Sequence, residues 1–139
     1  MIDYQIVTFN CFDERGAAIY HTNVVMCVGE KIAVICLDTI ENSGERNLLT
    51  ESLLKNNHEI IEISVEQMNR FAGNMLEVRN NKNENYLLMS ASAHESLNEK
   101  QLRQIENHAQ IVSANIETIE AVGGGSVRCM LAEIFCEKK

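Results

Sequence analysis

The sequence predicts an α/β fold built from repeated strand-strand-helix-strand units. Short apolar runs of strand length alternate with stretches of helical periodicity, and the same succession occurs twice. The two units open with Asn-Val-Val-Met at 23–26 and Asn-Met-Leu-Glu at 74–77, and these openings stand 51 residues apart, from position 23 to position 74. Because each unit has an apolar helix face and a sheet to cover, a period of this length predicts units packed around a common axis.

The first unit, residues 22–64, is predicted to contain two strands, a helix and a third strand, followed by a helical turn. These elements cover residues 24–28, 31–37, 42–56, 59–63 and 65–70. The second strand is apolar on both faces, which is typical of a central strand. The helix has Asn42 as its cap, with Glu45 three residues on. Its apolar face is formed by three leucines, Leu48, Leu49 and Leu53.

The second unit, residues 73–115, repeats this order. Its strands are predicted at 75–79, 86–90 and 111–114. Its helix opens with a capping box from Ser96 to Glu99. The apolar positions of that helix follow the i, i+3, i+7 pattern and are Leu102, Ile105 and Ala109.

The flanking stretches predict parts of further units. Residues 2–12 and 17–20 are expected to form strands that end a preceding unit. Residues 116–122 begin a third unit, and the apolar run 127–135 is expected to be a buried strand within a Gly-rich segment at 122–136. The chain 1–139 is therefore interpreted as a single domain of two full units and partial ones, which do not obviously close a ring.

Composition narrows the class of protein. With 12 basic against 20 acidic residues the net charge is −8, so neither a nucleic acid nor a membrane is an expected partner. The first residues lack a signal-peptide pattern, and no apolar run has the length of a membrane span. The five cysteines show no metal-binding spacing, which predicts free thiols, a cytoplasmic protein, and no metal or other cofactor. Four of them are interpreted as core or incidental residues: Cys11, Cys27, Cys36 and Cys136.

The segment with the clearest chemical signal is the glycine triplet at 123–125, followed by Arg128 and Cys129. Successive glycines let a backbone come close to a ligand or to another backbone. If the units pack around an axis, their openings bring His21, Asn23, Asn74 and Cys129 together. A thiolate and an imidazole so placed can act as nucleophile and general acid/base, and a cationic neighbour such as Arg128 favours the thiolate. The alternatives are a buried structural Cys and an ordinary turn role for Asn74.

Three motifs carry a family resemblance: Ile-Tyr-His-Thr-Asn-Val at 19–24, Arg-Phe-Ala-Gly-Asn-Met-Leu at 70–76, and Gly-Gly-Gly-Ser-Val-Arg-Cys-Met at 123–130. In order and spacing they resemble the C-terminal part of the amidinotransferase and arginine deiminase superfamily, the pentein fold. The closest branch is that of the citrulline-utilisation hydrolases. The resemblance covers nearly the whole chain, from about Tyr4 to Phe135.

The resemblance implies a propeller of five such modules around a central site, where a Cys attacks the central carbon of a guanidinium or ureido group. It implies that Cys129 is the nucleophile and His21 the acid/base, with Asn23, Asn74, Gly125 and Arg128 contacting the substrate. Asn23 stands where many relatives have Asp, which fits a neutral ureido substrate better than a cationic guanidinium. Citrulline, arginine, agmatine and a methylated arginine all stay open, as do hydrolysis and transfer.

Family members are about twice as long, and the modules that supply further carboxylates precede this region. The expectation is therefore a shorter natural chain, a split reading frame, a fragment, or a homo-oligomer in which a second chain completes the ring. The rival interpretation is an inactive module that uses its open edges to bind a partner or to self-associate.

Overall fold

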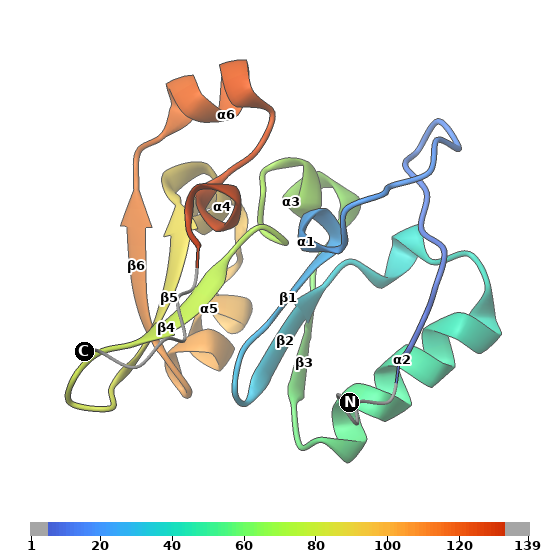
Figure 1. Ribbon diagram of the computed structural model, residues 1–139, viewed down its shortest axis with the longest axis horizontal. Helices are drawn as coiled ribbons and strands as arrows, with labels where there is room; N and C mark the ends of the chain where they lie inside the picture. The colour runs from blue at the N-terminus through green and yellow to red at the C-terminus, as the bar shows by residue number, and fades with distance from the viewer. Residues whose placement is uncertain (1–5, 133–139) are drawn as a thin grey trace.

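The computed structural model describes residues 6–132 as two three-stranded sheets that lie side by side (Figure 1). The first sheet has the order β1-β2-β3 and the second the order β4-β5-β6. The six strands are β1 (Met26–Val28), β2 (Ile32–Ile35), β3 (Glu59–Glu62), β4 (Leu76–Arg79), β5 (Asn85–Ser90) and β6 (Gln110–Ala114). In each sheet the first pair of strands is antiparallel and the second pair is parallel. Both sheets are therefore mixed and follow the same strand-strand-helix-strand path.

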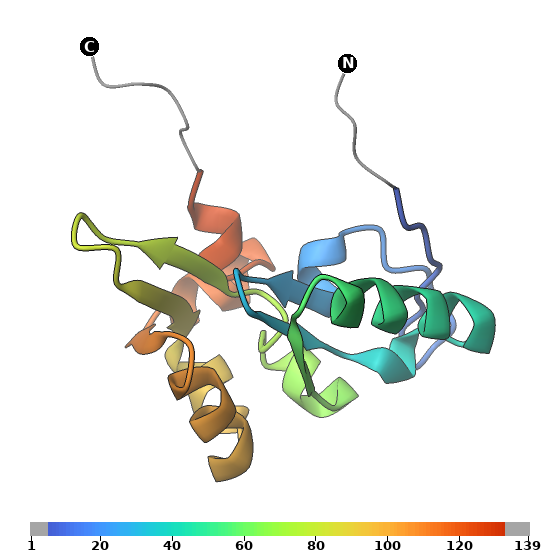
Figure 2. The same ribbon diagram turned by 90° about the horizontal axis from the view of Figure 1, so that it is seen from below.

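Helices make the crossovers that parallel pairing requires. Helix α2 (Ser43–Lys55) joins β2 to β3, whereas α4 (Ala91–Ser96) and α5 (Glu99–Glu106) join β5 to β6. Figure 2 shows each sheet with its own crossover helix packed beside it. The short elements are α1 (Thr22–Val25), η1 (Leu37–Thr39), α3 (Val65–Asn69), α6 (Glu117–Gly123) and α7 (Val127–Met130).

Helix capping confirms one sequence prediction and corrects another. The Asn42 side chain accepts hydrogen bonds from the backbone N–H groups of Gly44 and Glu45, at 2.8 and 3.2 Å. Helix α5 begins instead at Asn98, which forms a reciprocal capping box with Gln101. The expected cap Ser96 is the last residue of α4, so the capping box predicted there was wrong. Asn98 suits an N-cap position as well as serine does, because its side-chain oxygen accepts from the backbone N–H of Gln101 at 3.0 Å.

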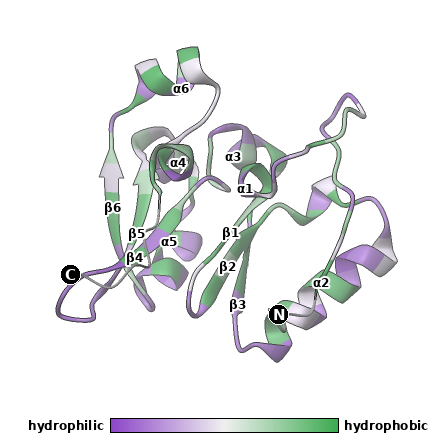
Figure 3. Ribbon diagram, viewed as in Figure 1, coloured by the Kyte–Doolittle hydropathy of each residue, from purple (hydrophilic) through white to green (hydrophobic). Residues whose placement is uncertain are grey.

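The hydrophobic core runs through both sheets. All four residues of β2 are fully buried, as expected for a central strand. Figure 3 shows this strand as hydrophobic, whereas the loop between β4 and β5 is hydrophilic. On α2, Leu49 and Leu53 are buried, being one turn apart on the same face. Leu48 lies about 100° around the helix from Leu49 and is 51% exposed, so its assignment to that face was wrong.

The flanking segments differ most from the sequence prediction. In the described part of 2–20 the pairing is a single isolated bridge between Phe12 and Ala18, so two strands were over-predicted there. Residues Val127–Met130 form the short helix α7 and not the start of a buried strand. In this segment the backbone N–H of Arg128 bonds to Asn74, and that of Cys129 bonds to Ser126 within the same turn. These backbone groups are therefore satisfied without pairing to a strand of the described residues. Residues 133–136 of the predicted strand lie outside the described residues.

The edge strands β1 and β4 bring the two modules into contact. The part of the chain that the structure describes shows two modules and no closed propeller. None of its helices is long and apolar enough to cross a membrane.

Candidate active site

The openings of the two modules meet at Asn23 and Asn74, the equivalent positions of the repeat. The Asn74 side chain is buried and donates a hydrogen bond from Nδ2 to the backbone oxygen of Asn23 at 2.8 Å. Gly73 lies against the other backbone so closely that a Cβ there would be 2.2 Å from the carbonyl oxygen of Val24. Only glycine allows this approach, and it places the two openings in direct contact.

Cys129 lies on this junction. Its Sγ atom is 3.3 Å from Nδ2 of Asn74 and 3.6 Å from Nδ2 of Asn23, so two side-chain amides point donors at the sulfur. The side chain is exposed. A sulfur that faces solvent and lies against two amide donors is placed to attack a carbon centre.

The glycine-rich loop shapes the approach to the sulfur. Gly124 ends α6 in the left-handed conformation, with φ of 67°. A Cβ on Gly125 would lie 3.1 Å from both Cβ and Sγ of Cys129, so glycine keeps this side of the thiol open. The backbone N–H of Arg128 donates to Asn74, at 3.1 Å to Oδ1 and 3.3 Å to the carbonyl oxygen. The loop is thereby fastened to the opening of the second module.

His21 is the predicted site residue that the structure does not bring onto the sulfur. It forms the N-cap of α1, two positions before Asn23, and its side chain is exposed. Within residues 6–132, no hydrogen bond joins its imidazole to Cys129. The structure therefore brings together Asn23, Asn74, Gly125, Cys129 and the backbone of Arg128, while His21 caps the short helix that carries Asn23.

A cleft of about 410 Å³ opens beside the junction, between β1 and the start of β4. Asn23 and Arg128 line it, and Cys129 adjoins it through these two residues without being part of its wall. Two carboxylates, Glu30 and Glu77, line it as well. The cleft therefore combines amide, guanidinium and carboxylate groups, which suits a small polar molecule of mixed charge.

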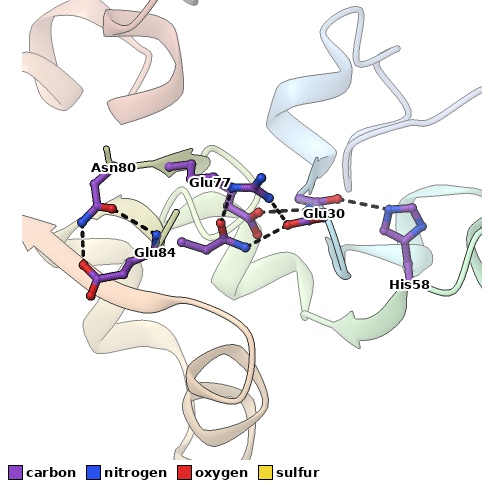
Figure 4. A network of polar contacts seen from close by, with 8 residues as sticks. Glu30, His58, Glu77, Asn80 and Glu84 are labelled. Atoms are coloured by element: carbon purple, nitrogen blue, oxygen red, sulfur yellow. Dashed lines mark hydrogen bonds and ion pairs between the residues drawn. The ribbon is translucent and has the colours of Figure 1, made fainter. Parts of the chain in front are cut away.

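The two carboxylates belong to a polar network that connects the hairpins of the two modules (Figure 4). The backbone N–H of Glu30 donates to Oε1 of Glu77 at 3.1 Å, and the Glu30 carboxylate accepts from Asn85 and Arg79. These two partners hold the pKa of Glu30 below its usual value, with Asn85 contributing most. The other oxygen of Glu77, Oε2, is buried with no hydrogen-bond partner among the described residues.

Glu30 was not predicted from the sequence as a residue of the site. The signal that could have found it is its place in the Gly29-Glu30 turn, which must face the equivalent strand of the second module once the repeat is recognised.

The remaining described thiols are of a different kind. Cys11, Cys27 and Cys36 are buried, as expected for core residues. Burial raises the pKa of each of these thiols, for Cys27 to about 12. Cys129 is therefore the exposed thiol of residues 6–132, while Cys136 lies outside the described residues.

Comparison with known proteins found a matching family model and a similar solved structure. A family model for eukaryotic N,N-dimethylarginine dimethylhydrolase matches residues 1–136. Among solved structures, the chain is similar to apo ArgZ, an arginine dihydrolase from the ornithine-ammonia cycle in cyanobacteria. The TM-score is 0.63 at 14% sequence identity, and the match covers 86% of this chain. No curated protein sequence matches the chain significantly.

The similar structure bears on the fold, and the family model bears on the family. The likeness to ArgZ shows a shared fold, and the chain spans 17% of the length of that protein. The family model names dimethylarginine hydrolases, so the closer relation to citrulline-utilisation hydrolases stays a prediction. Because the model matches almost the entire sequence, the chain belongs to the pentein-type family of eukaryotic N,N-dimethylarginine dimethylhydrolase.

Proposed function

We propose that this chain carries the nucleophilic part of a hydrolase active site that cleaves a C–N bond of a guanidino or ureido amino acid. The observation that carries the proposal is the position of Cys129. Its sulfur is exposed, lies within 3.6 Å of two amide donors, and adjoins a polar cleft at the junction of two modules.

In the proposed reaction, the Cys129 thiolate attacks the central carbon of the guanidinium or ureido group and forms a C–S bond. The C–N bond then breaks, and the leaving amine or ammonia takes a proton. A water molecule next gives up a proton to a general base and attacks the same carbon, after which the C–S bond breaks and the thiolate is restored. The amides of Asn23 and Asn74 stabilise the charge on sulfur before attack and after release.

His21 is proposed as the group that first donates and then accepts the proton. Its place at the start of α1, two residues from Asn23, puts it on the segment that contacts Cys129. An imidazole nitrogen can both donate and accept a proton, so one side chain can perform both steps. The residue pair Cys129 and His21 thus divides the chemistry as the family resemblance implies.

The substrate is proposed to be a methylated arginine, arginine or citrulline. The family name favours dimethylarginine, whose hydrolysis releases dimethylamine and leaves citrulline. The carboxylates of Glu30 and Glu77 suit a cationic group in the cleft, whereas Asn23 suits a neutral ureido group. A parallel assay of the three substrates distinguishes these possibilities.

The test is amine or ammonia release from each substrate by the wild-type protein and by Cys129→Ala and His21→Ala. Met130→Ala is the matched control, because Met130 follows the nucleophile and is itself 51% exposed. Turnover that is retained in the Met130 variant and lost in the other two supports the proposal. Turnover that survives Cys129→Ala would exclude a covalent mechanism through this residue.

A second candidate function is suggested by the exposed apolar side chains beside the junction. Tyr20, which precedes α1, is 88% exposed, and Val28, the last residue of β1, is 51% exposed. We propose that further modules or a second copy of the chain cover this edge and complete the cleft. Light scattering at graded protein concentrations measures the oligomer fraction, and the turnover assay of the same samples measures the activity per chain. The activity per chain should rise with the oligomer fraction, and an active monomer would contradict the proposal.

A further inference from the structure

Glu120, on α6, is the buried carboxylate of the described residues, with 8% of its surface exposed. Both of its oxygens accept short hydrogen bonds from serine hydroxyls. Ser126 donates to Oε1 and Ser92 donates to Oε2, each at 2.6 Å. A buried carboxylate with one hydroxyl donor on each oxygen is held in one orientation, because each hydroxyl turns its hydrogen toward it.

These bonds join three segments that are separate in the sequence. Ser92 lies in the first turn of α4, next to the cap residue Ser90, whose Oγ is 2.9 Å from that of Ser92. Ser126 is fully buried and lies at the end of the glycine-rich loop. Glu120 therefore ties the end of β5 and the start of α4 to the loop that carries Cys129.

The connection from Ser126 to Cys129 is direct. The backbone N–H of Cys129 donates to the carbonyl oxygen of Ser126 at 3.0 Å. On the opposite side of the loop, Arg128 is bonded to Asn74 through its backbone N–H. The nucleophile is thus held between two anchors, Asn74 in the second module and Glu120 behind the loop.

Electrostatics favour the charged form of this anchor. Burial by itself would raise the pKa of the Glu120 carboxyl, but hydrogen bonds from Ser126, Ser92 and Ser90, together with the charge of Arg70, outweigh it and hold the pKa below its usual value. Glu120 itself lines a pocket of about 230 Å³, together with the charged residues Arg70, Glu95 and Glu117. Glu120 therefore stays ionised at neutral pH in the presence of these groups.

We propose that Glu120 is a positioning residue for the nucleophile: acting through Ser126, it sets the place of the Cys129 sulfur against the amides of Asn23 and Asn74. As far as turnover is concerned, this inference rests on the proposed function. The chemical reactivity of the thiol tests it independently of any substrate.

The experiment compares alkylation of Cys129 by iodoacetamide in the folded wild-type protein, Glu120→Gln, Ser126→Ala and the double variant. Cleavage after glutamate separates the Cys129 peptide from Cys136, because Glu133 lies between them. Glu117→Gln is the matched control, since it makes the same charge change on an exposed position of the same helix. Each single variant should slow alkylation about five- to tenfold, the scale of the net contribution of one ordinary hydrogen bond.

The double variant shows whether Glu120 acts through Ser126. If it does, the double variant reacts no more slowly than the slower single variant, because both substitutions break the same link. If the rate losses of the two single variants multiply in the double variant, the proposal is overturned. It is also overturned if Glu120→Gln is alkylated at the wild-type rate while its melting temperature is lowered, because Glu120 would then only stabilise the fold. Should Glu120→Gln fail to fold, Ser126→Ala against Ser92→Ala decides the matter: a reactivity loss confined to Ser126→Ala supports the link, and equal behaviour contradicts it.

Turnover provides the second readout. With an active protein, Glu120→Gln should lower kcat about as much as it lowers the alkylation rate and leave KM within about twofold. If no variant or wild type turns over any substrate, the proposed function fails, while the alkylation series still supports or overturns the positioning role.

Discussion

The contact between the two modules can be tested at Gly73. Replacing it with Ala adds one methyl group whose carbon would lie 2.2 Å from the carbonyl oxygen of Val24 and 3.0 Å from two backbone carbons. All three are backbone atoms, so no side chain can turn aside. The two openings would have to separate by about 0.8 Å to restore the shortest separation that Cβ atoms show.

The energetic cost follows from this displacement. Overpacking against backbone costs roughly 1–3 kcal/mol. The Asn74 to Asn23 bond, at 2.8 Å, would stretch beyond hydrogen-bond length and cost about 1 kcal/mol more. The lower entropy of the unfolded chain with Ala offsets roughly 0.4–1 kcal/mol. The free energy of unfolding should therefore fall by about 1–3.6 kcal/mol in the Gly73→Ala protein.

Urea unfolding followed by circular dichroism measures this loss, with Cys129 alkylation as a second signal. Gly123→Ala is the control: it lies at the end of α6, and its added methyl would meet nothing closer than a side-chain carbon at 3.9 Å. That variant should be neutral or slightly more stable. If Gly73→Ala is within about 0.5 kcal/mol of the wild type, the two openings are not in the contact described, and the assembly of the site argued from it is refuted.

Asn74→Ala should lower stability by about 1–3 kcal/mol and slow Cys129 alkylation, because it removes hydrogen bonds to Asn23, Cys129 and Arg128 together; chemical unfolding and labelling kinetics measure both. In the native protein, iodoacetamide should modify Cys129 well before the buried Cys27, whose pKa is raised to about 12, and equal labelling in peptide maps would contradict the assigned exposure. Because the pKa of Glu120 is lowered by folding, its stabilisation is present above the unfolded value of about 4.3 and is lost as pH falls through the folded pKa. The stability difference between wild type and Glu120→Gln should therefore vanish in unfolding curves recorded at progressively lower pH, and a constant difference would argue against an ionised Glu120. Leu87→Ala, at a fully buried position of β5, should cost about 2–5 kcal/mol in the same measurement.

The sequence was informative where local pattern and tertiary environment agree. The run at 31–37 is apolar on both faces, and β2 is indeed the central strand of its sheet. The repeat offset of 51 residues placed Asn23 and Asn74 together, and their side chains do meet. The same packing argument, together with the glycine triplet before it, placed Cys129 beside them, and the motif resemblance gave it the role of nucleophile.

Prediction failed where a segment depends on a neighbour that the local pattern does not show. The apolar residues after Gly125 resemble a strand, but the backbone of Arg128 is bonded to Asn74, so Val127–Met130 closes into a helical turn. Glu120 was not recognised because an acidic residue on a short helix normally faces water. Its burial depends on two serines, one 28 residues before it and one 6 residues after it, and no spacing rule connects them.

The helix at Val127–Met130 and the burial of Glu120 both depend on tertiary contacts, and these contacts also hold the segment that carries Cys129. The residues that hold the sulfur come from α1, from the opening of the second module, and from α6, and the contact from Asn23 on α1 forms only when the two modules are in register. A free module would present the same glycine-rich loop without Asn23 on one side. The reactivity of Cys129 should therefore depend on the contact between the modules, and substitutions at Gly73, Asn74 and Glu120 should affect one shared property of the protein, the position of one sulfur atom.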